Sequence, residues 1–135
     1  MEPACIAGHF PLMVLVDSDI LIAVSRAKDP AIVARWLELS MSMDPLLCSV
    51  VTVAELWAGA RPAEHDALNQ LFNSLITVPV SAAIAKQAGA HFLQYSKSHG
   101  LELGDALIAA SAQATAAKLW TRNRKHYPMK NISFF

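Results

Sequence analysis

The sequence predicts an α/β protein, a three-layer sandwich in which a central, mainly parallel five-stranded sheet is flanked by helices. Short unbroken apolar runs, typical of strands buried on both faces, alternate with longer segments whose apolar residues recur at helical spacing. Strands that alternate with helices in this way favour parallel pairing through crossover helices. The 135 residues suit one domain with a sizeable core.

The strand runs cover residues 12–16, 46–51, 76–80, 119–122 and 132–135. Helical spacing predicts helices over residues 20–27, 30–39, 52–60, 62–75, 81–98 and 104–117. Asp29 stands where an N-cap would precede Pro30, and Gly100 is placed to end the long fifth helix. Residues 1–12 lack periodicity and contain two prolines, which predicts a flexible leader before a single domain of residues 13–135. Translation from Met1 and from Met13 are both compatible with this division.

The composition narrows the class of protein. Hydrophobic residues make up 54% of the chain and charged residues 16%, which favours an exposed apolar patch and hence a protein partner. No apolar run approaches the roughly 18 residues that span a bilayer, and Glu2 stands where a signal peptide would carry positive charge. We therefore expect a cytoplasmic protein without a membrane segment. Cys5 and Cys48 lack metal-ligand spacing and are expected to be free thiols.

Four polar residues are predicted to meet at one edge of the sheet. Asp17 directly follows the first strand, and Glu55 lies in the first turn of the helix after the second strand. The helix that begins near Asp105 runs roughly 18 Å, and the following strand returns a similar distance to Asn123. All four residues therefore belong to the carboxyl edge, where open α/β sheets bind ligands.

Each of these residues also has a purely structural interpretation. Asp17 or Asp19 would suit a helix cap, Asp105 a charge at a helix N-terminus, and Asn123 a turn. Thr52 and Glu55 have the spacing of a capping box. Caps have no reason to gather at one edge, however, and three neighbouring carboxylates repel one another unless a cation or a proton intervenes.

A hard divalent cation bound between the carboxylates would compensate that repulsion. Mg²⁺ takes a few carboxylate ligands and keeps several waters, which suits Asp17, Glu55 and Asp105 with Asn123 as a neutral oxygen donor or water-holder. Such a site can orient water for in-line attack on a phosphodiester and neutralise the developing charge. The pattern therefore points to nuclease chemistry.

Four segments of the chain, VDSDILIA, SVVTVAELWAGAR, LELGDALIAASA and LWTRNRKHYPM, resemble the motif blocks of PIN-domain ribonucleases, in particular the VapC toxins of toxin–antitoxin pairs. The resemblance covers nearly all of the chain from Met13 onward. It implies that Asp17, Glu55 and Asp105 bind Mg²⁺ or Mn²⁺ and activate water for RNA cleavage. Asn123 stands where some members carry a further aspartate, which lowers the charge of this site, and Asp19 is an additional acid beside it.

The resemblance also implies partners. VapC toxins are homodimers that a VapB-type antitoxin holds inactive, with its tail across the acidic pocket. A guanidinium is well suited to such a pocket because its planar fork pairs with two carboxylate oxygens. The implied substrate is RNA.

Supporting roles are predicted for residues beside this edge. The hydroxyls of Ser18 and Thr121 would orient a carboxylate or a water, or else bond the local backbone. Residues 67–135 hold two acids against seven Lys and Arg, and a run near their end is either an RNA-binding rim or a solvated turn; it includes Arg122, Arg124, Lys125 and His126.

Two other functions remain open from the sequence alone. Asp17 and Asp19 after a buried strand also resemble the paired aspartates of haloacid-dehalogenase phosphatases, but Leu21 stands where that family has Thr or Val. The other alternative is a binding module, either a catalytically silent PIN domain or a receiver-like domain.

Overall fold

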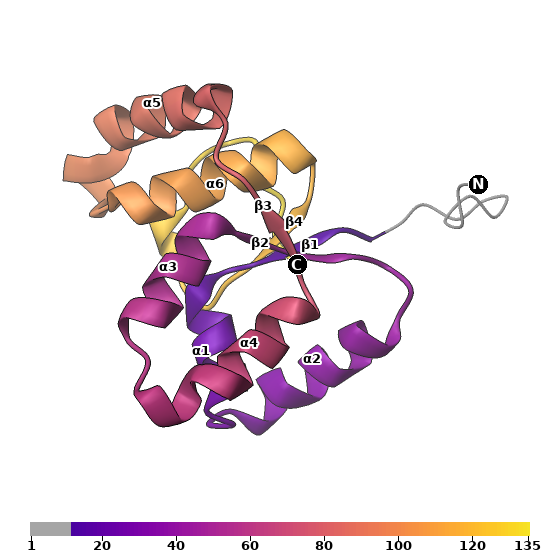
Figure 1. Ribbon diagram of the computed structural model, residues 1–135. Helices are drawn as coiled ribbons and strands as arrows, with labels where there is room; N and C mark the ends of the chain where they lie inside the picture. The colour runs from indigo at the N-terminus through magenta and orange to yellow at the C-terminus, as the bar shows by residue number, and fades with distance from the viewer. Residues whose placement is uncertain (1–11) are drawn as a thin grey trace, which may run out of the picture.

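A computed structural model describes residues 12–135 and shows a sheet between two layers of helices (Figure 1). In chain order the elements are β1 (Val14–Val16), α1 (Ser18–Ser25), α2 (Pro30–Met41), β2 (Leu46–Ser49), α3 (Val50–Ala58), η1 (Pro62–Glu64), α4 (His65–Asn73), β3 (Ile76–Val78), α5 (Ala82–His99), α6 (Leu103–Thr115), β4 (Lys118–Trp120) and η2 (Arg124–His126). The predicted α/β class is confirmed.

The sheet has four parallel strands in the order β3-β2-β1-β4. The fifth strand predicted over residues 132–135 is wrong, because this segment makes only one bridge, between Leu119 and Phe134. Two backbone hydrogen bonds flank Leu119, one from its N–H to Ser133 and one from Phe135 to its carbonyl. The apolar side chains of the segment instead pack onto the two cores: Ile132 and Phe134 onto one and Phe135 onto the other.

Alternation along the central strand β1 divides the interior in two. Leu15 belongs to a core shared with α5 and α6, which lie on one face of the sheet (Figure 1). Val14 and Val16 point to the other face and join a core built with α1, α2, α3 and α4. All three side chains are fully buried. The strand thus anchors both layers, and its carboxyl end leads directly into Asp17.

The helix ends follow local side-chain chemistry. Asp29 caps α2 by accepting from the backbone of Ala31 and Ile32, and Gly100 ends α5 in the left-handed conformation at φ 63°, as predicted. The helix predicted over residues 62–75 is divided, because a 3-10 turn after Pro62 precedes α4.

The second strand and its helix differ from the expected boundaries. β2 ends at Ser49, whose hydroxyl accepts from the N–H of Val51 at 3.1 Å and so starts α3 earlier than predicted. The capping-box alternative for Thr52 and Glu55 is therefore excluded, because both residues lie inside the helix and their side chains can face another element.

The predicted leader falls almost entirely on residues 1–11, and Cys5 with it, so both lie outside the described residues. Cys48 is a buried free thiol, as expected. Among residues 12–135, every helix is too short or too polar to span a bilayer.

Candidate active site

A pocket of about 170 Å³ lies where β1, α1, α3, α6 and η2 meet at the carboxyl edge of the sheet. Four carboxylates line it, together with a serine, an asparagine, a histidine and a tyrosine; the lining residues are Asp17, Ser18, Asp19, Ile22, Glu55, Asp105, Asn123, His126 and Tyr127. The four polar residues predicted to meet at this edge, Asp17, Glu55, Asp105 and Asn123, are thus all present in one pocket.

Asp17 is the most firmly held of the acids. Its Oδ1 accepts from the N–H of Ser18 at 2.7 Å, and its Oδ2 accepts from the hydroxyls of Thr121 at 2.8 Å and Tyr127 at 2.9 Å. Its own N–H donates to the carbonyl of Trp120 on the neighbouring strand. The side chain is only 6% exposed, so this buried carboxylate is fixed from two sides while it also caps α1.

Glu55 is oriented by a different helix. The Ser18 hydroxyl donates to Glu55 Oε1 at 2.9 Å and also lies 3.0 Å from the Thr52 hydroxyl. Partial burial raises the pKa of Glu55, and the charges of Asp17 and Asp105 raise it further, while the bond from Ser18 acts in the opposite direction. The carboxyl group therefore holds its proton more tightly than an isolated glutamate does.

Asp105 both stabilises the start of α6 and lines the acidic pocket. Its Oδ2 accepts from the N–H of Glu102 at 3.3 Å, which closes the start of α6, while its Oδ1 lies 3.5 Å from the Tyr127 hydroxyl. The ring Nδ1 of His126 lies 3.9 Å from Oδ2. Desolvation is the main reason that the pKa of Asp105 is raised, and the charge of Asp17 adds to the effect.

Asp19 lies on the other flank of the pocket. Its Oδ2 accepts from the N–H of Arg122 at 3.0 Å and from the Asn123 amide at 3.3 Å. Its Oδ1 is buried and has no hydrogen-bond partner among the described residues. Burial, followed by the charge of Asp17, raises the pKa of Asp19 to about 6.

Two residues of this site had no role in the sequence prediction. Tyr127 is 3% exposed and reaches two of the acids with its hydroxyl, and Thr52 is fully buried beside Ser18. Burial and the surrounding carboxylates raise the pKa of Tyr127, so its hydroxyl remains a proton donor. Tyr127 lies within the fourth motif block, which was the available signal, whereas Thr52 was considered only as part of a possible capping box.

The predicted basic rim is divided. Arg122 pairs with Asp29 at 3.0 Å. Arg124 donates to the carbonyl of Phe135 at 3.0 Å and lies over the Phe134 ring. Lys125 is exposed in η2, and His126 lines the pocket. The side chains of the two arginines are therefore engaged with the protein itself rather than presented toward the acids.

The donor set fits a hard divalent cation in its chemistry. The acids offer only oxygen, and Asp19 Oδ1 is buried without a partner in the part of the chain that the structure describes. Burial, together with neighbouring carboxylates, raises the pKa values of Asp19, Glu55 and Asp105. Within residues 12–135 no three carboxylates, imidazoles or thiols form a ready-made metal cluster, and the Tyr127 hydroxyl donates to Asp17 and lies 3.5 Å from Asp105 Oδ1. A cation bound by these acids would therefore require their side chains to move closer together.

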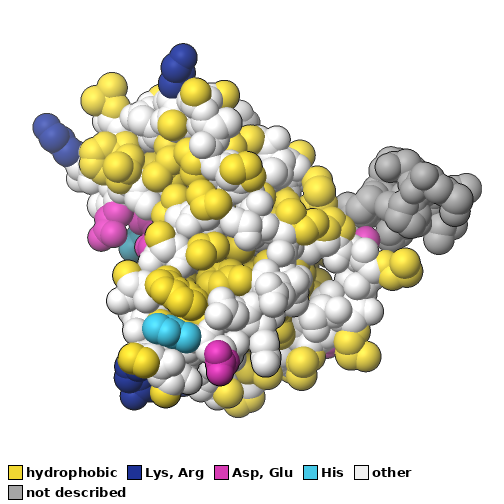
Figure 2. Space-filling model, viewed as in Figure 1, with side chains coloured by type: hydrophobic (Ala, Val, Ile, Leu, Met, Phe, Trp, Pro, Cys, Tyr) yellow, Lys and Arg dark blue, Asp and Glu magenta, His cyan; other side chains and the backbone are white. Residues whose placement is uncertain are grey.

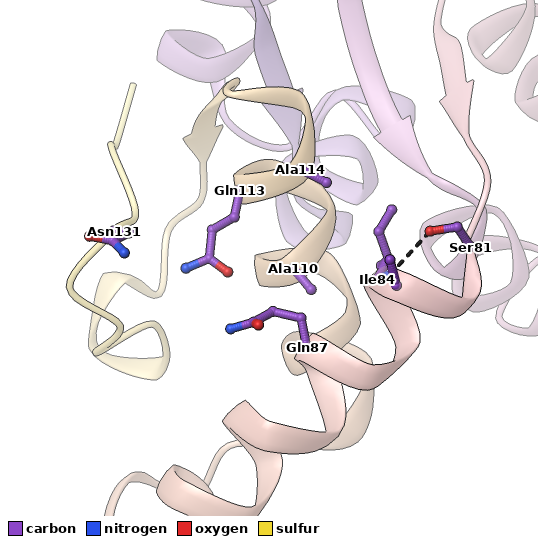
Figure 3. A pocket seen from close by; sticks show the side chains of 8 residues that line it. Ser81, Ile84, Gln87, Ala110, Gln113, Ala114 and Asn131 are labelled. Carbon is purple, nitrogen blue, oxygen red and sulfur yellow. Dashed lines mark hydrogen bonds between the residues drawn. The ribbon is translucent and has the colours of Figure 1, made fainter.

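A larger cavity of about 500 Å³ lies elsewhere, beside α5 and α6 (Figure 3). Its polar lining consists of Ser81 and the amides of Gln87, Gln113 and Asn131, with no acid or base. Gln113 Oε1 lies 2.7 Å from Nε2 of the buried His91, which ties the two helices together. The cavity lacks charge for phosphate chemistry, so the smaller acidic pocket is the candidate active site.

The fold and the acidic edge define the class of this protein. A sequence model of the PIN domain matches residues 14–132, and the chain belongs to the PIN-domain family. Within that family its relatives are VapC proteins. The chain is 42% identical to Ribonuclease VapC10 of Mycobacterium tuberculosis over 119 residues, which cover 87% of each chain. It is 34% identical to Ribonuclease VapC19 of the same species over 118 residues, covering 87% of this chain and 94% of the relative.

Solved structures agree on the fold. VapBC2 of Rickettsia felis, bound to a promoter DNA fragment, matches 92% of this chain and 98% of its own with a TM-score of 0.76 at 17% identity. VapBC of Salmonella typhimurium, also bound to DNA, matches 92% of this chain and 97% of its own with a TM-score of 0.75 at 18% identity. The phosphatase and receiver-like alternatives are therefore set aside in favour of the PIN fold.

Proposed function

We propose that this protein is a Mg²⁺- or Mn²⁺-dependent endoribonuclease and the toxin of a toxin–antitoxin pair. The observation that carries the proposal is the convergence of Asp17, Glu55 and Asp105 on one small pocket. The two relatives that match most of the chain are named ribonucleases, which supports the proposal. Retention of all three acids also argues against a catalytically silent member of the family.

Asp17, Glu55 and Asp105 are the residues that would hold the cation. A bound divalent cation would supply an activated water and would neutralise charge on the phosphate and the leaving oxygen. Thr121 and Tyr127 fix the Asp17 carboxylate, and Ser18 fixes that of Glu55, so two of the three acids are already oriented by neighbouring hydroxyls. Without a cation, the raised pKa values of Glu55 and Asp105 favour retention of protons in the pocket.

Asn123 and Asp19 form the outer side of the site. The Asn123 amide donates to Asp19 Oδ2, so this neutral residue partly compensates an acid at the edge of the pocket. His126 lines the same pocket close to Asp105, where a cationic form would favour a phosphate. These contacts support a site that accepts an anionic strand only when its own negative charge is compensated.

Asp105→Asn tests the proposal. The change keeps the shape and removes one charge, so we expect RNA cleavage in Mg²⁺ to fall by about 100-fold or more while the free energy of unfolding changes by less than ~1 kcal/mol. Asp66→Asn, on the exposed face of α4, is the matched control and is expected to cleave like the unmodified protein. If the Asp105→Asn protein remained active, Asp105 would have only a structural role at the start of α6.

We also propose that a VapB-type antitoxin and a second copy of this chain are its protein partners. Exposed hydrophobic side chains occur on α3 and α5, where Val50, Trp57, Phe92 and Leu93 are 37–86% exposed. Figure 2 shows many hydrophobic side chains on this side of the molecule. The solved relatives from Rickettsia felis and Salmonella typhimurium are VapBC complexes, which supports the antitoxin. Light scattering of the free protein tests the dimer, and an exclusively monomeric protein would contradict it.

A further inference from the structure

Three basic side chains share one depression that the proposed nuclease site does not use. The depression has a volume of about 530 Å³ and is lined by Ser25, Arg26, Lys28, Arg61 and Glu64. The first 66 residues contain only four Lys and Arg, and three of them lie here. Segments from the end of α1 and from the turn after α3 therefore concentrate positive charge at one place in an otherwise acidic half of the chain.

The depression connects to the acidic pocket. A small cavity of about 40 Å³ lies between them along α1 and α3, which pack side by side (Figure 1). It shares Ile22 and Glu55 with the acidic pocket, and it shares Ser25, Arg26 and Glu64 with the basic depression. The three pockets therefore adjoin one another, and we call the row that runs from the carboxylates to the three bases the track.

The charge of the depression is positive even after its one acid is counted. Glu64 Oε1 lies 3.2 Å from Arg61 Nε, and its Oε2 lies 3.6 Å from Arg26 Nε, so one carboxylate serves two guanidinium groups. The Arg61 side chain is 80% exposed and that of Arg26 39%, against 22% for Glu64. The cations therefore face solvent more than the acid does, which suits an anionic ligand.

The length of the track suits a strand of nucleic acid. Between Asp19 in the acidic pocket and Arg26, α1 rises roughly 10 Å. The phosphates of an extended single strand lie farther apart than the ~3.4 Å rise per strand of a duplex, so about two phosphates would span this interval. The acidic pocket repels an anionic strand, and positive charge beside it compensates that repulsion.

We propose that Arg26, Lys28 and Arg61 bind phosphates of the RNA strand whose cleaved bond lies in the acidic pocket. This assignment rests on the proposed ribonuclease function and adds the path of the substrate. RNA is favoured over an acidic protein segment because the bases continue a track that begins at the proposed reacting centre, and a phosphodiester strand carries charge at regular intervals along its whole length.

Binding of a fluorescein-labelled oligouridylate in EDTA tests the track without hydrolysis. The variant Arg26→Gln/Lys28→Gln/Arg61→Gln should weaken binding by about 10-fold or more, and the slope of log affinity against log salt should fall by about 2, since each phosphate contact in a single strand contributes ~0.7. The matched control Lys86→Gln/Lys97→Gln/Lys130→Gln removes the same charge outside the track and should change affinity less than about 3-fold. Equal losses in both variants would overturn the proposal.

Glu64→Gln provides a test in the opposite direction. Removal of the competing carboxylate should tighten oligouridylate binding several-fold, whereas Asp66→Asn, two residues away and outside the depression, should not. Thermal melts of all variants identify any that fail to fold, and a folded Glu64→Gln protein with unchanged or weaker binding would contradict the assignment.

Cleavage kinetics separate this inference from the function on which it rests. In Mg²⁺ the triple variant should raise KM about 10-fold and leave kcat within about 2-fold, because the bases hold the strand away from the cleaved bond. If the unmodified protein cleaves no RNA, the proposed function fails. The oligouridylate measurement still shows whether the three bases bind RNA. A labelled oligoglutamate peptide distinguishes the other source of negative charge: binding of the peptide through the three bases, with oligouridylate binding unaffected by the variant, would overturn the RNA assignment.

Discussion

The Tyr127 hydroxyl donates to Asp17 Oδ2 at 2.9 Å across 110 residues of sequence. The same hydroxyl lies 3.5 Å from Asp105 Oδ1, so one side chain from the segment after β4 touches two acids of the pocket. Thr121 donates to the same oxygen of Asp17. The fourth motif block therefore supplies the hydroxyls that hold the central carboxylate in place.

Tyr127→Phe should lower both stability and activity. A hydrogen bond to a charged group is worth roughly 1.5–3 kcal/mol, and because Thr121 and the Ser18 N–H remain, we expect the free energy of unfolding to fall by about 1–2 kcal/mol. Loss of a partner that orients a ligand typically costs about 10-fold or more in activity, and here kcat should fall more than KM rises. Urea denaturation and RNA cleavage measure the two effects.

Tyr95→Phe is the control for that substitution, because Tyr95 is partly buried on α5 and packs against His99. It should leave cleavage unchanged. If Tyr127→Phe destabilises the protein but cleaves RNA at the normal rate, the tyrosine only packs the core and does not orient Asp17.

The pKa of Asp19, raised from 3.8 to about 6, predicts a pH dependence of stability. Between these values the folded protein binds more protons than the unfolded chain, so the free energy of unfolding falls as the pH rises through this range. The contribution is complete below about pH 3.8 and is lost above about pH 6. In EDTA, Asp19→Asn should remove this decline and stabilise the protein at pH 7 by about 1 kcal/mol, after allowance for solvent screening.

Denaturation of the unmodified protein and of Asp19→Asn at both ends of that range gives the answer. Parallel curves, with the same difference at low and neutral pH, would mean that Asp19 titrates normally in the folded protein. Asp44 and Asp66 lie outside the pocket lining, and replacement of Asp66 by Asn controls for the general loss of one acid.

Much of the fold was predictable because it depends on local signals. Asp29 before Pro30 and Gly100 after a long amphipathic run determine helix ends through their own side chains or backbone, and both predictions are confirmed. The sequence could not show that the fifth strand would be absent. An apolar run such as the one around Phe134 fits a strand and also fits an irregular segment that packs onto the core. Only the available backbone partners distinguish the two cases.

The candidate site shows the same division. Strand and helix lengths placed Asp17, Glu55 and Asp105 at one edge, and the structure brings them to one pocket. The contacts that orient them were beyond sequence reasoning, because Ser18 meets Glu55 and Tyr127 meets Asp17 only through long-range packing. The basic depression was missed for that reason too: Arg26 and Arg61 are distant in sequence and meet at Glu64.

An antitoxin that inhibits at the acidic pocket should do so with a guanidinium, since a planar fork pairs with two carboxylate oxygens. Replacing an Arg near the C-terminal end of the co-expressed antitoxin by Ala should preserve the complex, because we expect apolar contacts to supply most of the affinity, but it should restore RNA cleavage. A complex that forms and remains fully silent would place inhibition away from Asp17 and Asp105.

The central claim is that the crowded carboxylates of this pocket act through a divalent cation. The most direct measurement is RNA cleavage by the purified protein in EDTA, followed by addition of excess Mg²⁺ or Mn²⁺ to the same sample. We predict no cleavage in EDTA and full recovery on addition of the cation. Cleavage that continues undiminished in EDTA would contradict the account.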